Sequence, residues 1–264
     1  MMTLTMNSLK NKTVVVTQAS EDAAAFRGYL EKQAANVYEF PTIRFHKKTP
    51  ETFGANVALA ADPAKHDLLI FTSRHAALFF IEMIGRVEEN RGWSSVPSVA
   101  IGETTASVLR ENGFTVWMIP QESTSVAIAQ EIGDIEGKRI LLPRSQLADA
   151  ALPKALEAKG AVVTSLVLYD TEYIDARDEK LEKMVEKMLD AGTDSLYISF
   201  TSPSTVAGFT RRLEKSILAK VIASAPAICI GPVTAEAARS IGFTHILVAD
   251  PHTLPGMVDA MLKG

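Results

Sequence analysis

The protein has 264 residues, 47% of them hydrophobic and 22% charged, a composition typical of globular proteins that bury a sizeable core. Its formal net charge of -4 argues against broad electrostatic binding of nucleic acid, because such binding needs a basic face. The single cysteine, Cys229, excludes an intrachain disulfide, and no run approaches the roughly 20 apolar residues that span a bilayer.

From the N-terminus, residues 1–12 lack the long apolar core of a signal peptide, so we expect a cytoplasmic protein. Residues 13–16 form a β-branched run, and apolar residues at helical spacing follow it. This succession of strand and helix indicates parallel sheets covered by helices on both faces, as in doubly wound α/β folds. Further strands are predicted over 67–71, 98–101, 139–142, 195–200 and 227–230.

Two segments differ from this pattern. Residues 38–45 and 164–173 are extended and moderately polar, and they lie where two halves of the chain would exchange strands. These segments are therefore predicted to connect two domains. The run 178–187 alternates acids and lysines at helical spacing, which predicts a solvated helix face.

The second half of the chain repeats the first at an offset of 129 residues. Several separated matches at one spacing indicate a duplication and two domains facing one cleft. The duplication alone would place the boundary near Gly137. The matches include Ile101-Gly102 with Ile230-Gly231, Phe71-Thr72-Ser73 with Phe200-Thr201-Ser202, Gly113-Phe114-Thr115 with Gly242-Phe243-Thr244, and Thr124 with Thr253.

Small hydroxyl residues follow nearly every predicted strand. In open parallel sheets, ligands bind beyond the carboxyl ends of the strands, where helix N-termini present free N–H groups. The hydroxyls therefore either cap helices or surround an anionic ligand such as a carboxylate or phosphate. These residues are Thr17, Thr72, Ser73, Thr104, Thr105, Ser145, Thr201, Ser202 and Thr234.

Glycines and arginines at the same strand ends are further candidates. Gly102 and Gly231 either supply tight turns or allow the backbone to approach a ligand closely. Arg74 and Arg144 either pair with substrate carboxylates or lie solvated at the surface. The five histidines show no metal-ligand spacing, so no metal site is predicted.

Together these residues resemble the uroporphyrinogen-III synthase family, over about residues 12–262. The order and spacing of the motifs carry the resemblance, since each motif alone is weak. The motifs are Val14-Val15-Val16-Thr17, Phe71-Thr72-Ser73, Ala100-Ile101-Gly102 with Thr105-Ala106, Leu168-Tyr169-Asp170-Thr171, Phe200-Thr201-Ser202-Pro203-Ser204, and Ile230-Gly231-Pro232 with Thr234-Ala235.

The resemblance implies two flavodoxin-like, doubly wound parallel-sheet domains joined by a two-stranded connector. It assigns residues 1–38 and 173–264 to one domain, 45–164 to the other, and 39–44 and 165–172 to the connectors. It also implies a cyclising hydro-lyase of tetrapyrrole (haem) biosynthesis, which closes hydroxymethylbilane to uroporphyrinogen III with loss of water and inversion of ring D. No cofactor is expected. Transient contact with hydroxymethylbilane synthase and a monomeric state are expected.

The same resemblance assigns roles to residues. Tyr169 matches a family tyrosine near the cleft and is the predicted catalytic residue, as a hydrogen-bond donor or general acid; a structural role at the connector is the alternative. The predicted substrate-binding residues are Thr17, Ser73, Arg74, Gly102, Thr105, Arg144, Ser145, Thr201, Ser202, Gly231 and Thr234.

The chain departs from the family pattern at two places. Many relatives carry Arg-Pro after the first strand's threonine, whereas this chain has Gln18-Ala19, and Arg74-His75 is also unusual. A synthase that has lost its activity is therefore one alternative. A two-domain protein that binds an anionic tetrapyrrole without chemistry is the other.

Overall fold

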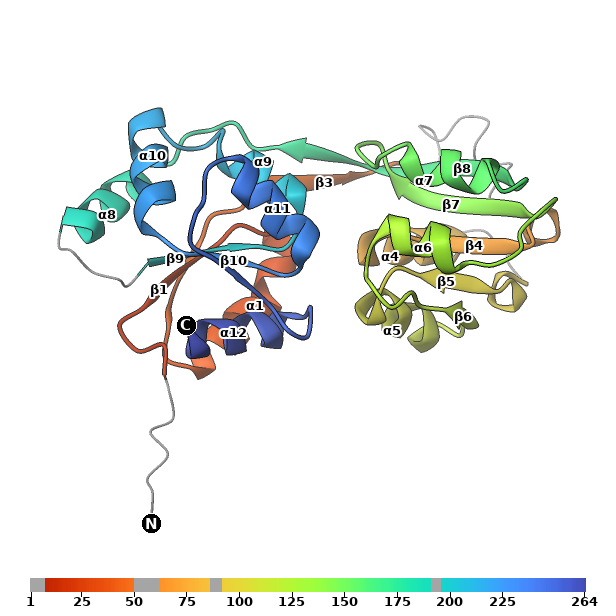
Figure 1. The fold of residues 1–264 in the computed structure, drawn as a ribbon, viewed down its shortest axis with the longest axis horizontal. Helices are drawn as coiled ribbons and strands as arrows, with labels where there is room; N and C mark the ends of the chain where they lie inside the picture. The colour runs from red at the N-terminus through yellow and green to blue at the C-terminus, as the bar shows by residue number, and fades with distance from the viewer. Residues whose placement is uncertain (1–7, 50–61, 86–91, 191–195) are drawn as a thin grey trace, which may run out of the picture. The chain divides into compact units, whose positions relative to one another are not determined.

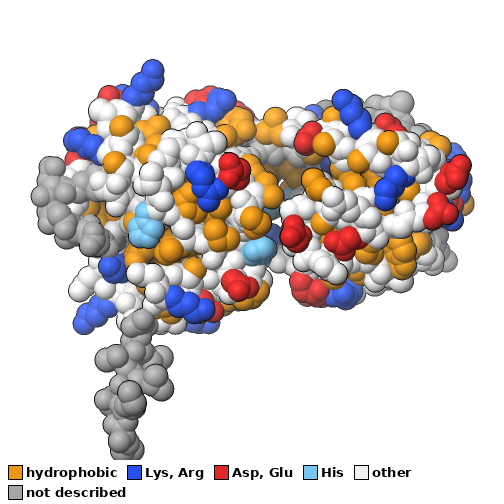
Figure 2. All heavy atoms as spheres, viewed as in Figure 1, with side chains coloured by type: hydrophobic (Ala, Val, Ile, Leu, Met, Phe, Trp, Pro, Cys, Tyr) orange, Lys and Arg blue, Asp and Glu red, His pale blue; other side chains and the backbone are white. Residues whose placement is uncertain are grey.

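The computed structural model describes residues 8–49, 62–85, 92–190 and 196–264 (Figure 1). The chain divides into two compact units, which we call unit 1 (residues 1–44 and 172–264) and unit 2 (residues 45–171). No helix within the described ranges is long and apolar enough to cross a membrane. On the face drawn in Figure 2, acidic and basic side chains are interspersed with apolar ones.

Unit 1 contains a parallel five-stranded sheet in the order β11-β10-β9-β1-β2. Counted along the chain, this is the order 2-1-3-4-5 of flavodoxin-like folds. The strands are β1 (Thr13–Val16), β2 (Asn36–Glu39), β9 (Leu196–Phe200), β10 (Ala227–Cys229) and β11 (Ile246–Val248). The helices are α1 (Ser20–Lys32), α8 (Glu179–Asp190), α9 (Pro203–Phe209), α10 (Lys215–Ser224), α11 (Pro232–Ser240) and α12 (Leu254–Lys263).

Two apolar clusters cover the two faces of this sheet. Successive strand residues point to opposite faces, so Val15 packs under α8 to α11 while Val14 and Val16 pack under α1 and α12. All three valines have no exposed surface. Burial on both faces explains why the strands read as continuous apolar runs rather than as alternating ones.

Unit 2 contains a six-stranded sheet in the order β3-β8-β7-β4-β5-β6. Its last five strands repeat the arrangement of unit 1, with α4 and α5 on one face and α6 and α7 on the other. The strands are β3 (Ile43–Lys47), β4 (Leu68–Phe71), β5 (Ser98–Ala100), β6 (Val116–Met118), β7 (Arg139–Ser145) and β8 (Val162–Tyr173). The helices are η1 (Pro63–Lys65), α4 (Arg74–Gly85), η2 (Trp93–Ser95), α5 (Glu103–Glu111), α6 (Ser125–Glu131) and α7 (Ala151–Glu157).

The two predicted doubly wound parallel sheets are confirmed, although Ser195, at the predicted start of one strand, lies outside the described residues. The units meet in sequence at residues 44/45 and 171/172, within β3 and β8. Much of β8 pairs with β7, from Val162 to Tyr169. The assignment of 39–44 and 165–172 to connectors stays a prediction.

Strand pairing extends the repeat to a part of the sequence where no motif matches. Val14 pairs with Tyr197, and Ile140 pairs with Leu68, which is the counterpart of Tyr197 at the offset of 129. Val14 and Ile140 are therefore equivalent, and so are the residues four places after them, Gln18 and Arg144. These equivalent residues are separated by fewer positions than the offset of 129, so the motif matches do not reveal them.

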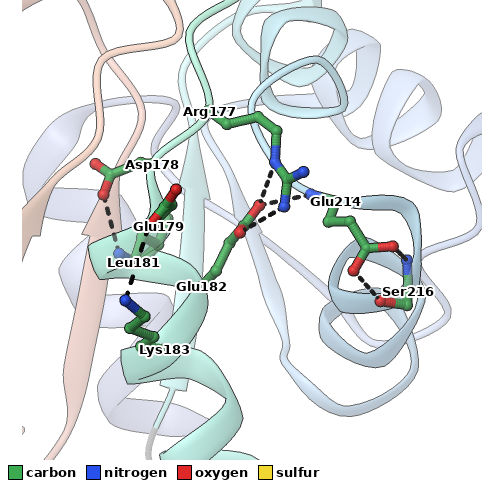
Figure 3. A network of polar contacts seen from close by, with 8 residues as sticks. All are labelled: Arg177, Asp178, Glu179, Leu181, Glu182, Lys183, Glu214 and Ser216. Atoms are coloured by element: carbon green, nitrogen blue, oxygen red, sulfur yellow. Dashed lines mark hydrogen bonds and ion pairs between the residues drawn. The ribbon is translucent and has the colours of Figure 1, made fainter.

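The helix α8 is not wholly solvated, in contrast to the prediction for residues 178–187. Glu182 is 7% exposed, and its carboxylate accepts two hydrogen bonds from Arg177, at 3.1 and 2.7 Å, and one from the Glu214 N–H at 2.7 Å (Figure 3). The network joins the first turn of α8 to the start of α10. A cavity of about 330 Å³ beside it is lined mainly by charged residues and by none of the predicted site residues.

The Arg177 hydrogen bonds hold the pKa of Glu182 below its ordinary value. A carboxyl whose pKa is lowered by folding stabilises the protein above its ordinary pKa, and this contribution disappears as the pH falls through the lowered value. We expect Glu182→Gln to lower the free energy of unfolding at pH 7 by about 1–2 kcal/mol. The difference from the wild type should shrink in urea titrations at successively lower pH.

The exposed Glu179, 3.7 Å from Lys183, provides the matched control. Exposed pairs on a helix contribute about 0.5 kcal/mol or less, so Glu179→Gln should leave the unfolding curve nearly unchanged. Equal losses of unfolding free energy in the two variants would show that the Glu182 network does not stabilise the protein more than an exposed ion pair does.

Candidate functional site

The predicted site residues lie at the carboxyl edges of the two sheets. In unit 1, Thr17 follows β1, Thr201 and Ser202 follow β9, and Gly231 and Thr234 follow β10. In unit 2, Ser73 and Arg74 follow β4, Gly102 and Thr105 follow β5, Arg144 and Ser145 end β7, and Tyr169 pairs with Ser145 from β8. Because parallel strands end at the same edge, each unit gathers its own set of candidates.

Tyr169 and Ser73, predicted separately, form a hydrogen bond. The Tyr169 hydroxyl lies 3.1 Å from Ser73 Oγ, which also accepts the Ala76 N–H at 3.0 Å and so caps α4. The tyrosine is 4% exposed, and its ring packs edge-on against Phe45 and Phe79. Such packing fixes the position of the hydroxyl, as a positioned proton donor requires.

Arg144 is a buried cation without a paired carboxylate. It is 6% exposed, and its guanidinium donates to the carbonyl oxygen of Asp149 at 2.5 Å. No carboxylate of the described residues lies within 4.0 Å of it. Burial lowers its pKa, and the negative charge of Asp149 offsets part of this shift. A desolvated guanidinium is costly unless an anion pairs with it, so this position is suited to binding a substrate carboxylate.

Arg212 shows the structural alternative for a buried arginine. It is 9% exposed, donates to the carbonyl oxygens of Pro41 and Ala176, and lies 4.0 Å from Asp178. Its guanidinium also lies over the ring of Phe40 at 4.2 Å. Arg212 therefore has a counter-ion and several partners within unit 1, whereas Arg144 has one hydrogen bond, to a carbonyl, and the charge of Asp149 beyond ion-pair distance.

Two predicted hydroxyls are occupied by bonds within the protein. The Thr17 hydroxyl, in a residue with no exposed surface, donates to the Ser199 carbonyl at 2.6 Å. The Ser145 hydroxyl lies 3.0 Å from Thr171 Oγ1 and 2.8 Å from Gln146 Oε1. These bonds hold neighbouring strands together, and any role in binding substrate stays a prediction for both residues.

Helix capping accounts for the position of Ser202. Its hydroxyl accepts the Thr205 N–H at 3.2 Å in a capping box, and Pro203 occupies the first turn of α9. Of the two alternatives for the hydroxyls, capping is therefore confirmed for Ser202. Thr201 is partly exposed beside it, and Arg74 is exposed at the start of α4. Thr105 and Thr234 are 3% and 4% exposed in the first turns of α5 and α11.

The tight-turn interpretation of Gly102 and Gly231 is wrong. Both have φ of −169°, which is extended backbone open to any residue. The two glycines differ in the room available for a side chain. A Cβ on Gly102 would lie 2.7 Å from Ser123 Oγ, whereas one on Gly231 would meet the His252 ring at 3.6 Å, an ordinary contact. Both glycines are N-caps without a side-chain hydrogen bond, which leaves first-turn N–H groups without a side-chain cap.

Gln18 is buried after β1, which the sequence did not reveal. It is 7% exposed, and its Oε1 is buried without a hydrogen-bond partner among the described residues. It occupies the position of Arg144 in the other unit. The only signal for Gln18 in the sequence was its departure from the family pattern. Its equivalence to Arg144 follows from the pairing of the strands, which the sequence does not show.

No cluster of three or more potential metal-ligating side chains occurs in the part of the chain that the structure describes. Cys229 is fully buried in β10, and burial raises its pKa to about 12. A thiol in this environment stays protonated and acts as a small apolar side chain.

The chain matches the family model described as uroporphyrinogen-III synthase HemD over residues 24–259. It is 25% identical over 262 residues to a uroporphyrinogen-III synthase of Chlorobaculum parvum, with 96% of this chain and 98% of that protein covered. It is also 25% identical over 256 residues to the porphyrin biosynthesis protein HemD of Ruminiclostridium josui, covering 95% of this chain. The chain spans about half of that protein's length, 48%.

Its fold is similar to that of a mutant uroporphyrinogen III synthase from the extremely thermophilic bacterium Thermus thermophilus, known from a crystal structure. The TM-score is 0.68, with 96% of this chain and 100% of that chain covered. At 19% sequence identity, the similarity shows a shared fold.

Proposed function

The chain belongs to the uroporphyrinogen-III synthase family, and we propose that it closes hydroxymethylbilane to uroporphyrinogen III, with loss of water and inversion of ring D. Family membership over residues 24–259 favours this activity over a binding protein without chemistry. Because the substrate carries eight carboxylates, its recognition depends on groups that bind anions.

The single observation that carries the proposal is the buried, unpaired guanidinium of Arg144 at the carboxyl edge of unit 2. A carboxylate of the substrate would supply its missing counter-ion. The first-turn N–H groups of α5 and α11 would bind further carboxylates, each contributing about 0.3–1 kcal/mol. Several such contacts act together, so the net charge of −4 does not prevent binding.

The reaction requires that the reacting rings of the substrate be held in a defined position. Loss of the hydroxyl from the first ring leaves an electrophilic azafulvenium, which the substituted carbon of ring D attacks to form a spiro intermediate. This intermediate fragments and recloses to isomer III. We assign Tyr169, held against Ser73, to donate a hydrogen bond or proton to the departing hydroxyl. The remaining contacts hold ring D so that its substituted carbon reacts first.

The proposal includes a monomer in the cytoplasm and transient contact with hydroxymethylbilane synthase. The support for that contact is chemical. Hydroxymethylbilane closes spontaneously to isomer I, so a short time between release and capture would favour isomer III.

An isomer assay tests the function. Hydroxymethylbilane is generated in situ, the protein is added, and the oxidised products are separated into uroporphyrin I and III by chromatography. The proposal expects isomer III in proportion to the protein added. If a folded sample yields isomer I alone, the chain is not an active synthase, and a binding role without chemistry takes its place.

A further inference from the structure

The same juxtaposition of a glycine and a polar side chain occurs in both units. In unit 2, Gly102 at the N-terminus of α5 lies against Ser123; in unit 1, Gly231 at the N-terminus of α11 lies against His252. Both pairs obey the offset of 129. The threonine that follows Ser123 or His252 caps the next helix, α6 or α12. The duplication therefore places His252 at the carboxyl edge of unit 1.

The imidazole of His252 is accessible there. The residue is exposed, and its ring atoms lie 3.6–4.0 Å from where a Cβ of Gly231 would be. Gly231 caps α11 without a side-chain hydrogen bond, and Pro232 has no N–H to offer. The first N–H groups of this helix therefore belong to Val233 and Thr234, close in sequence to the glycine beside His252.

Charge distinguishes the two edges. Arg144 brings a guanidinium to the edge of unit 2, but its counterpart in unit 1 is the neutral Gln18. The unit 1 segments that follow the strands contain the acids Glu21 and Asp250 but no lysine or arginine; these segments are residues 17–21, 40–42, 201–204, 231–234 and 249–253. Within these segments, His252 is the only basic side chain. Arg212 reaches the Pro41 carbonyl from outside them, but Asp178 is its counter-ion.

We propose that His252 binds a carboxylate of the substrate, together with the first-turn N–H groups of α11. An imidazolium donates hydrogen bonds from both ring nitrogens, and bonds from a charged donor to a carboxylate are about twice as strong as neutral ones. His252 then takes in unit 1 the part that Arg144 takes in unit 2. This inference rests on the proposed function, and it adds a binding residue that the sequence motifs did not identify.

His252→Gln and His252→Arg separate the charge of the side chain from its size. With hydroxymethylbilane, we expect the glutamine variant to raise KM about tenfold with kcat nearly unchanged, because one charge-assisted contact is lost. The arginine variant keeps the charge and should stay within about twofold of the wild type. His245→Gln is the matched control, because His245 is also exposed but precedes β11, at the opposite edge of the sheet.

Binding of uroporphyrin III, an octacarboxylate, provides a readout that does not depend on catalysis. The dissociation constant should weaken about tenfold in His252→Gln and little in His245→Gln. Equal affinity of the wild type and His252→Gln overturns the inference, as does an unchanged KM. A wild-type protein that binds uroporphyrin III but makes only isomer I defeats the proposed function, and the binding comparison still decides the role of His252.

Discussion

Replacing Arg144 with methionine should lower kcat/KM for the formation of uroporphyrinogen III about 100-fold without lowering the stability of the protein. The activity falls because a desolvated guanidinium bound to a carboxylate contributes about 2–3 kcal/mol to binding. Stability is maintained because the free protein no longer buries a cation whose one hydrogen bond goes to the Asp149 carbonyl and which has no carboxylate within ion-pair distance among the described residues. Isomer assays and urea unfolding measure the two effects separately.

Arg212→Met is the matched control for stability. Arg212 is similarly buried, but its removal leaves two carbonyl oxygens without their donor and takes the counter-ion from Asp178, which keeps only its bonds from Tyr38 and the Leu181 N–H. Its loss should reduce the free energy of unfolding by about 3 kcal/mol. If Arg144→Met instead destabilises the protein as much as Arg212→Met and retains activity, Arg144 is structural and its assignment to the substrate fails.

Tyr169→Phe is expected to lower kcat about 100-fold, since a positioned proton donor contributes at least this factor. The ring keeps its packing against Phe45 and Phe79, so the melting temperature should change by only a few degrees. Single-turnover assays with hydroxymethylbilane measure the chemical step, and thermal unfolding measures the fold.

Ser73→Ala separates the proton donor from its partner. The variant removes the Tyr169 hydrogen bond and the cap of α4, but it leaves the phenol in place. Loss of a cap costs about 1 kcal/mol, and kcat should fall less than in Tyr169→Phe. Unchanged turnover in Tyr169→Phe would reject the donor role and leave the tyrosine as a packing residue.

Local patterns in the chain were enough to predict the elements and the duplication. Strands such as Val14-Val15-Val16 are continuous apolar runs because both faces of a parallel sheet are buried, and this requirement is written locally in the chain. The cap at Ser202 was equally local, because a hydroxyl followed by proline fixes a helix start within four residues. The family resemblance likewise depended on short motifs in a fixed order.

Which polar groups already have partners within the protein became known from the folded structure. Thr17 and Ser145 look like other hydroxyls at strand ends, yet they bond to Ser199 and Thr171, residues distant in sequence. Glu182 looks like a solvated acid until α10 covers it. Arg144 differs from Arg212 only in the partners that folding brings to it. Burial and pairing arise from contacts between distant segments, which local sequence patterns do not record.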